Sequence, residues 1–247
     1  MKFSAIPVNI YKMKQIIIAS TSTVHGSGYL EYLLPQIEYL FSKASTILFI
    51  PYARPGGISH DAYTNTAKKA FSKIGKSVKG IHEYNHPIDA IKNAEGIFVG
   101  GGNSFLLVKQ LYKYNLLLAI KNSLSMGVPY LGTSAGSNIC GLSIGTTNDM
   151  PIVYPPSFNA LGIVPFNINP HYIDPEPSSK HMGETRETRI KEFHKFNTLP
   201  VIGLREGSYL YINDEKIILK GDLSARIFKH DLTPYEIESG SDLSDLN

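Results

Sequence analysis

The stretch "YLGTSAGSNI", residues 130–139, passes from apolar residues into a serine held between small residues. Gly132, Ser134 and Gly136 match the pattern G-x-S-x-G, in which a nucleophilic serine stands where a strand turns sharply into a helix. Small neighbours are needed there because a tight turn brings backbone atoms close together. An ordinary strand–helix turn with a capping serine would use the same residue types. The spacing alone therefore leaves two interpretations open, a nucleophile elbow and a capped loop.

The same stretch belongs to a series of short apolar runs that alternate with helical patterns. Buried strands are predicted at 15–20, 46–51, 96–100 and 129–133, where the runs are bounded by turn residues. Apolar residues at helical spacing predict helices at 29–43, 61–74, 104–115 and 116–127. This alternation predicts an α/β fold, a three-layer sandwich with a mostly parallel central sheet and helices on both faces.

The C-terminal third has a different pattern. Residues 146–183 are rich in Pro, Asn, Thr and His, and a loop of that length within a compact domain usually carries function. A helix is predicted at 184–197. Strands separated by turns are predicted at 201–204, 208–213, 216–221 and 225–230. The C-terminal part is therefore expected to be rich in β-structure.

One domain is expected over residues 13–236, because no repeat and no linker divides the chain. Met13 and Lys14 repeat the initial Met-Lys pair just before the first strand, so residues 1–12 are expected to be an N-terminal extension. The final residues, 237–247, are polar and acidic and are expected to form a flexible tail.

The composition excludes several classes of protein. The 247 residues are 43% hydrophobic and 18% charged, which argues against wholesale disorder. The net charge of +3 is spread along the chain without a Lys/Arg block, so binding to nucleic acid is not expected. Cys140, the only cysteine, excludes a disulfide within the chain and fits a reducing, cytoplasmic location. No apolar run is long enough to span a bilayer, and no membrane partner is expected.

Three stretches rich in small or polar residues follow predicted strands. They are "VGGGNSF" (99–105), "TSAGSN" (133–138) and "REGSY" (205–209). Open parallel sheets bind ligands at the carboxyl ends of their strands, so these stretches are expected to meet. If Ser134 is a nucleophile, the backbone N–H of Ala135 would point at the developing oxyanion. Gly101 or Gly102 would supply a second N–H donor.

A serine nucleophile needs a base, and His171 is the candidate among the eight histidines. It stands in "NINPHY", directly after Pro170, whose ring stiffens the chain and would hold the imidazole in place. The acid that orients this imidazole is left open between Asp149 in "TTNDMP" and Glu206 in "LREG". No two histidines have the helical spacing of a zinc site with an intervening glutamate, so no metal is expected.

Six motifs together resemble the peptidase E family of α-aspartyl dipeptidases, the serine peptidases of family S51. They are "GGGNSF", "YLGTSAGSN", "TTNDMPIV", "NINPH", "GETRETRI" and "VIGLREG", in the order and approximate spacing of that family between residues 13 and 230. The resemblance implies a flavodoxin-like fold of the class I glutamine amidotransferase type and hydrolysis of peptides that begin with aspartate. It implies Ser134 as nucleophile and His171 as base. Both acids fall in family motifs, and Glu206 is preferred because its strand end would face the same crevice.

A substrate of this kind presents a carboxylate, for which arginine is the natural bidentate partner. Arg186 in "GETRETR" is the first candidate, and Arg205 beside Glu206 is another. Asn103 and His25 are further candidates for lining the pocket. The expected partners are small peptides with an N-terminal aspartate, the protein is expected to be a monomer or homodimer, and no cofactor is expected.

Two residues depart from the family pattern. Thr133 stands where a larger aromatic residue is expected, and Arg205 replaces an expected proline, so fine specificity is expected to differ. Two alternative functions remain: a cyanophycinase-like hydrolase of β-linked aspartyl peptides, and a catalytically silent member that binds an acidic peptide. The slightly basic composition speaks against the first, and the retained serine, histidine and acids speak against the second.

Overall fold

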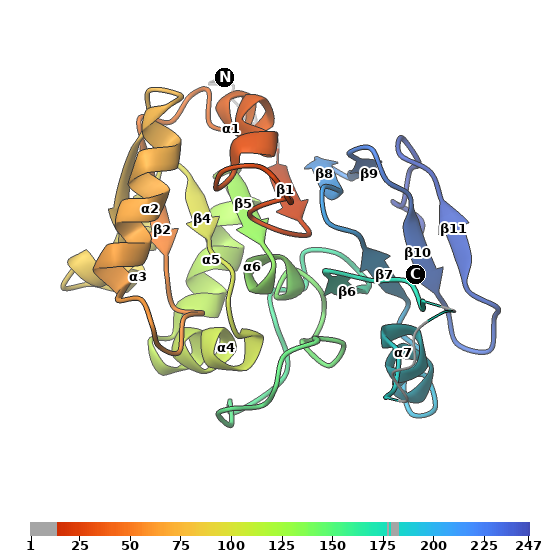
Figure 1. Cartoon of the computed structure of the whole chain (residues 1–247). Coiled ribbons are helices and arrows are strands. Elements are labelled where there is room, and N and C mark those ends of the chain that lie inside the picture. Colours follow the sequence, from red (N-terminus) through yellow and green to blue (C-terminus); the bar gives the residue numbers. More distant parts are fainter. Residues whose placement is uncertain (1–13, 177, 179–182) are drawn as a thin grey trace, which may run out of the picture.

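A computed structural model describes residues 14–176, 178 and 183–247, so the extension predicted at 1–12 lies outside the described residues (Figure 1). Its centre is a seven-stranded sheet with the strand order β3-β2-β4-β5-β1-β8-β9. Strands β1 to β5 pair in parallel, whereas β8 and β9 are antiparallel additions at one edge. The strands are β1 (Gln15–Ala19), β2 (Thr46–Ile50), β3 (Ser77–Gly80), β4 (Ile97–Val99), β5 (Tyr130–Thr133), β8 (Tyr209–Asn213) and β9 (Lys216–Lys220).

Helices cover both faces of this sheet. The alternation along β1 shows the two faces, because Ile16 and Ile18 belong to one buried apolar cluster and Ile17 and Ala19 to another. Helices α1 and α2 pack in the second cluster, and α3, α4, α5 and α6 pack in the first. The helical segments are η1 (Glu31–Leu33), α1 (Leu34–Leu40), α2 (His60–Ser72), η2 (Ile81–Glu83), α3 (Pro87–Lys92), α4 (Ser104–Lys113), α5 (Leu116–Ser125), α6 (Ala135–Asn138) and α7 (Arg186–Phe193).

A second, four-stranded sheet lies beside the central sheet, with α7 next to it (Figure 1). Its strand order is β11-β10-β7-β6, and β6 and β7 are parallel neighbours. The strands are β6 (Asn167–Pro170), β7 (Val201–Leu204), β10 (Ala225–Phe228) and β11 (Tyr235–Ile237). The predicted α/β class, the mostly parallel central sheet and the β-rich C-terminal part are thus confirmed.

Several elements differ from those predicted. Strands β3, β6 and β11 and helix α3 were not predicted, and the helix expected at 29–43 is confined to η1 and α1. Leu30 just before it has a left-handed backbone with φ 60°, which a continuing α-helix does not allow. Residues 237–247 were expected to form a flexible tail, but residues 240–243 lie along β9. The N–H of Leu243 donates to the carbonyl of Ile217 (2.7 Å), and the side chains of Leu243 and Leu246 are buried.

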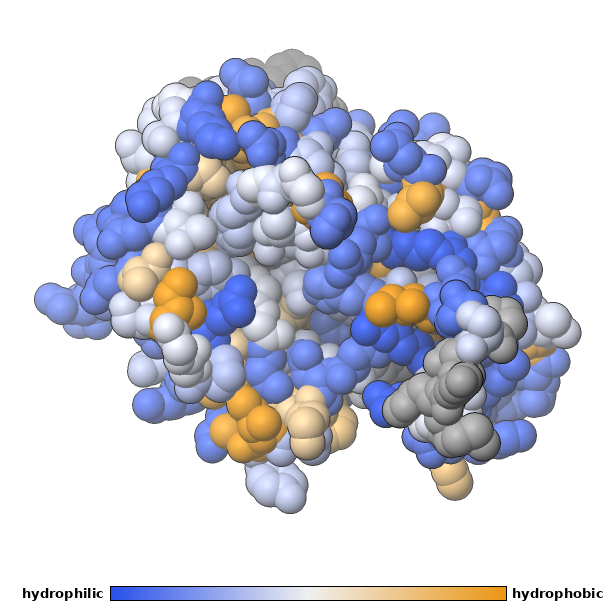
Figure 2. Space-filling model, in the orientation of Figure 1, coloured by the Kyte–Doolittle hydropathy of each residue, from blue (hydrophilic) through white to orange (hydrophobic). Residues whose placement is uncertain are grey.

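Hydrophilic residues cover most of the face shown in Figure 2, where hydrophobic residues form separated patches. No helix in the described part of the chain is long and apolar enough to cross a bilayer.

Candidate active site

Ser134 stands on a sharp turn between β5, which ends at Thr133, and α6, which begins at Ala135. Its backbone has φ 54° and ψ −112°, a left-handed conformation that is uncommon for a residue with a side chain and that concentrates at functional sites. The backbone packs closely here: a Cβ atom added to Gly136, two residues after the serine, would collide with the carbonyl of Val99 in β4. The side chain of Ser134 makes no capping hydrogen bond to α6, so its hydroxyl is available for other contacts.

That hydroxyl faces His171, the residue that follows β6. The Nε2 atom of His171 lies 2.9 Å from Oγ of Ser134. The helix α6 brings the two together because it contacts both β5 and β6, and its Asn138 amide donates to the carbonyl of Ile168 in β6 (2.7 Å). His171 also has a left-handed backbone, with φ 55°. Its N–H donates to Oγ of Ser20 (2.8 Å), which anchors the turn to the carboxyl end of β1.

Glu206 lies on the other side of the imidazole. Its Oε1 atom is 2.6 Å from Nδ1 of His171. The proximity follows from strand register, because Pro170 at the end of β6 pairs with Leu204 at the end of β7. With Nδ1 donating to the carboxylate, Nε2 is free to accept from the serine hydroxyl. The side chains of His171 and Glu206 are 31% and 50% exposed, so peptides from solvent can reach this row of three side chains.

The glycine loop after β4 lies directly against the serine. A Cβ atom added to Gly101 would come within 2.9 Å of Cβ of Ser134. The N–H groups of Gly101, Gly102 and Ala135 donate no hydrogen bond to another described residue. Tyr63 holds the loop from behind, since its hydroxyl donates to the carbonyl of Gly101 (3.3 Å). These free N–H groups next to Ser134 are the arrangement that an oxyanion requires.

Asp149 and Asn103 lie at the N-terminus of α4 instead. One carboxylate oxygen of Asp149 accepts from the N–H of Ser104 (2.6 Å) and from the hydroxyl of Thr147 (3.1 Å). The amide oxygen of Asn103 caps α4, and its NH₂ group donates to the carbonyl of Met150 (2.9 Å). Both residues therefore fasten the glycine loop to the long loop that follows α6. Of the two acids left open by the sequence, Glu206 is the one placed at His171.

Arg186 is the first residue of α7. Its Nη1 atom is buried and has no hydrogen-bond partner among the described residues. Burial lowers the pKa of its guanidinium, while the negative charge of Glu206 acts in the opposite direction. A buried donor without an acceptor is costly, so this atom is poised for an acceptor that the described part of the chain does not supply.

The remaining sequence candidates lie elsewhere. Arg205 is engaged in ion pairs with Asp174 and Glu236, and hydrogen bonds to Glu236 and Asp174 raise its pKa. His25 is exposed in the loop after β1 and makes no hydrogen bond to another described residue. Thr133 is fully buried, and its hydroxyl has no partner among the described residues.

Sequence reasoning missed Ser20, which joins the two sheets at the site. Its hydroxyl accepts from the N–H of His171 and donates to the carbonyl of Leu204 at the end of β7 (2.7 Å). The signal was present, because Ser20 is the last residue of the run predicted as a strand at 15–20, and strand ends of this kind face the ligand site.

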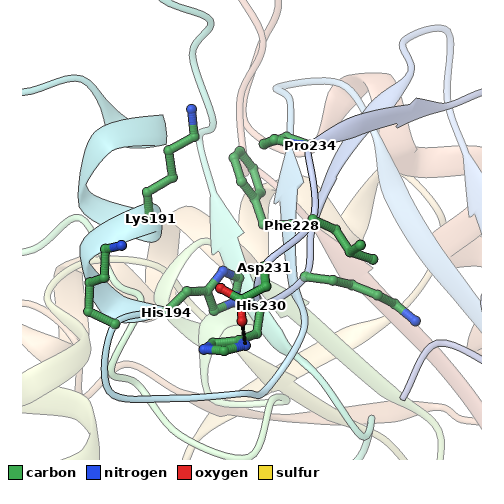
Figure 3. A pocket seen from close by; sticks show the side chains of 9 residues that line it. Lys191, His194, Phe228, His230, Asp231 and Pro234 are labelled. Atoms are coloured by element: carbon green, nitrogen blue, oxygen red, sulfur yellow. Dashed lines mark ion pairs between the residues drawn. The ribbon is translucent and has the colours of Figure 1, made fainter.

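A separate cavity of about 400 Å³ lies between the C-terminal end of α7 and the turn after β10 (Figure 3). Several of its polar side chains already have partners within the chain. Nε2 of His194 contacts the carbonyl of Leu199 (2.9 Å), and His230 pairs with Asp231 (3.0 Å). Lys191 pairs with Glu187 (2.6 Å). The cavity is lined by none of the side chains of the Ser134–His171–Glu206 row.

The chain is similar to known peptidases. The model of peptidase family S51 matches residues 16–220. A peptidase E of Streptomyces coelicolor is 46% identical, over 94% of each chain. A protein of Drosophila melanogaster assigned as an α-aspartyl dipeptidase is 48% identical, over 94% of this chain and 97% of its own. The fold resembles that of a crystallised peptidase from an acI-B1 actinobacterium, with a TM-score of 0.70 at 16% identity over 94% and 97% of the two chains.

Proposed function

This chain belongs to peptidase family S51, and we propose that it is a serine dipeptidase that hydrolyses dipeptides with an N-terminal aspartate. The observation that carries the proposal is the row Ser134–His171–Glu206, with distances of 2.9 and 2.6 Å between its members. The names of the relatives, peptidase E and α-aspartyl dipeptidase, support the substrate class.

The geometry supports an acyl-enzyme mechanism. His171 takes the proton of the Ser134 hydroxyl at Nε2 while Oγ attacks the scissile carbonyl carbon. Glu206 keeps the proton on Nδ1 and stabilises the imidazolium. The carbonyl electrons move onto oxygen, and the N–H groups of Ala135 and Gly101 or Gly102 stabilise this oxyanion.

The tetrahedral intermediate collapses when His171 gives its proton to the leaving amine, and the carbon–nitrogen bond breaks. Water then attacks the aspartyl ester on Ser134, with His171 again as base, and releases free aspartate. Each proton and each charge in these steps is handled by a side chain or a backbone N–H of this chain. The proposed mechanism therefore uses no metal and no organic cofactor.

Substrate selection is assigned to Arg186. Its buried Nη1 atom lacks a partner among the described residues, and the aspartyl side-chain carboxylate would supply the missing acceptor. Guanidinium groups bind carboxylates in a bidentate manner, so aspartate is preferred over its neutral isostere asparagine. We propose further that the enzyme acts as a monomer or homodimer on free peptides in the cytoplasm, a location supported by the single, buried and unpaired Cys140.

Release of leucine from Asp-Leu, Asn-Leu, Leu-Leu and β-Asp-Leu tests the proposal. Asp-Leu is expected to be cleaved fastest, and Ser134→Ala is expected to abolish this cleavage. Hydrolysis of Leu-Leu at the same rate would contradict the preference for aspartate, and unchanged activity of Ser134→Ala would contradict the nucleophile. Preference for β-Asp-Leu would favour a cyanophycinase-like activity, and cleavage of none of the four peptides would favour a catalytically silent member.

A further inference from the structure

Arg205, directly before Glu206, donates six hydrogen bonds from its guanidinium group. Its Nε and Nη2 atoms donate to the two carboxylate oxygens of Asp174 (2.9 and 2.7 Å). Its Nη1 and Nη2 atoms donate to the two oxygens of Glu236 in β11 (2.8 and 3.1 Å). Nη1 also donates to the carbonyl and hydroxyl oxygens of Ser224 (2.8 and 3.0 Å). The side chain is only 15% exposed, so these contacts are shielded from water.

These contacts close a ring that contains the catalytic base. Asp174 lies three residues after His171, and Arg205 is bonded covalently to Glu206. The bidentate pair between Asp174 and Arg205 therefore joins the segment that carries the base to the segment that carries the acid. The hydrogen bond between Nδ1 of His171 and Glu206 completes the ring. Bidentate arginine–carboxylate pairs fix geometry as well as distance, because both groups are planar.

The acid depends on this anchoring. The hydrogen bond to His171 is the only one that the Glu206 carboxylate makes within the described residues, and the side chain is half exposed. Its position is therefore set by the backbone at the end of β7. His171 stands in a left-handed conformation, which persists only where the surroundings hold it. The hydroxyl of Ser20 accepts a hydrogen bond from the N–H of His171, and the Asp174–Arg205 pair anchors the segment that follows His171.

The anchoring extends to the helix that carries Arg186. Arg226 in β10 donates to Glu236 (3.0 Å) and to Glu187 (3.1 Å), the residue after Arg186. Glu236 thus receives hydrogen bonds from both Arg205 and Arg226. One carboxylate in β11 therefore links the acid–base pair to the first turn of α7.

We propose that Arg205 is a positioning residue, which holds His171 and Glu206 in hydrogen-bond register through Asp174 and Glu236. This inference rests on the proposed function and replaces the sequence-based expectation that Arg205 binds substrate. All of its guanidinium nitrogen atoms already donate to residues of the chain. A carboxylate of the substrate would have to displace one of these acceptors to bind there.

The test uses the full chain with Arg205→Met, Arg205→Lys, Asp174→Asn and the double variant Arg205→Met/Asp174→Asn. The control is Lys73→Met, which removes a half-exposed surface ion pair with Glu31 (3.4 Å). Three quantities are measured: kcat and KM for Asp-Leu, the rate at which diisopropyl fluorophosphate labels Ser134, and the thermal unfolding midpoint. Labelling needs the activated serine but no peptide-binding site, so it reports on the row of side chains even if Asp-Leu is not the substrate.

For folded Arg205→Met, kcat and the labelling rate are both expected to fall about 10- to 100-fold with KM nearly unchanged, since a small misplacement of catalytic groups costs about that much. Asp174→Asn should also lower kcat and the labelling rate. In the double variant these rates should fall no further than in the more strongly impaired single variant, because both substitutions break the same contact. Arg205→Lys should retain part of the rate that Arg205→Met loses. Labelling of folded Arg205→Met at the wild-type rate would overturn the proposal. A rise in KM with unchanged kcat would also overturn it and would return Arg205 to substrate binding.

Discussion

Nε2 of His171 lies 2.9 Å from Oγ of Ser134, although the two residues extend from different sheets. The short helix α6 makes this possible, because it starts at the nucleophile and packs against the strand that ends at the base. Both residues have left-handed backbones, with φ near 55°. Two turns with positive φ, one at each residue, therefore bring the serine hydroxyl and the imidazole into direct contact.

The first prediction separates the two acids. Glu206→Gln is expected to lower kcat for Asp-Leu by about 10³- to 10⁴-fold, because a neutral amide no longer stabilises the imidazolium. Asp149→Asn is expected to lower kcat much less and to reduce the free energy of unfolding by about 1 kcal/mol, because Asp149 accepts from the N-terminus of α4. Steady-state kinetics and urea unfolding of both variants check this. A larger loss of kcat in folded Asp149→Asn than in Glu206→Gln would contradict the assignment.

The second prediction concerns the glycine loop. Gly101→Ala would place a methyl group 2.9 Å from Cβ of Ser134 and 3.4 Å from its Oγ. The loop and the serine must then move apart, and losing one oxyanion donor costs about 3–4 kcal/mol of barrier, so kcat should fall by about two orders of magnitude or more. Gly56→Ala is the matched control, since an added Cβ there meets no atom within 4 Å. Equal kcat values for the two folded variants would rule out close packing of this loop on the nucleophile.

The central strands were predictable because they are short apolar runs, whereas β6 was not. Its sequence "NINP" contains two asparagines, yet all four residues are buried. Asn167 accepts from the N–H of Ser143 (3.0 Å), and Asn169 donates to the carbonyl of Thr146 (2.7 Å). These partners come from a distant loop, so the polar strand is satisfied only by tertiary contacts that no local pattern reveals.

The residue types of the candidate site were predictable, but their pairing was not. The serine turn and the proline-flanked histidine have local signatures, and both acids also stand in distinctive motifs. The partner of His171 depends on the register of β6 against β7, which places Glu206 beside it. The partners of Arg205 were not predictable for a similar reason, since its acceptors Asp174 and Glu236 lie 31 residues away on either side.

The third prediction concerns charge recognition by Arg186. Arg186→Met is expected to lower kcat/KM for Asp-Leu by about 10²-fold, because a charge-assisted bidentate contact is lost. The same substitution should leave kcat/KM for Asn-Leu almost unchanged. Competition between Asp-Leu and Asn-Leu measures the ratio of their kcat/KM values directly. An equal loss of kcat/KM for both peptides would show that Arg186 supports the structure of the site and does not bind the aspartyl carboxylate.

The last prediction concerns Cys140, whose thiol is buried and donates to the carbonyl of Gly136 (3.3 Å) just behind the nucleophile turn. Burial raises the pKa of this thiol from 9.0 to about 12. The unfolded chain therefore loses the proton above about pH 9, while the folded chain keeps it. Because the unfolded state binds fewer protons in this range, the free energy of unfolding falls as the pH rises from 9 towards 12.

Cys140→Ala removes this contribution, so the variant provides the measurement. Between pH 8 and pH 10 the wild type is expected to lose about 1.4 kcal/mol more of its free energy of unfolding than the variant. The reason is that pH 10 lies about one unit above the ordinary thiol pKa, and one such unit corresponds to about 1.4 kcal/mol. Urea unfolding of both proteins at pH 8 and pH 10 gives the two losses of free energy. The contributions of the buried tyrosines, which both proteins share, cancel in the comparison. If wild type and variant lose the same amount, the thiol is ionised as readily in the folded chain as in the unfolded chain, and the packing of Cys140 behind the nucleophile turn is looser than the structure describes.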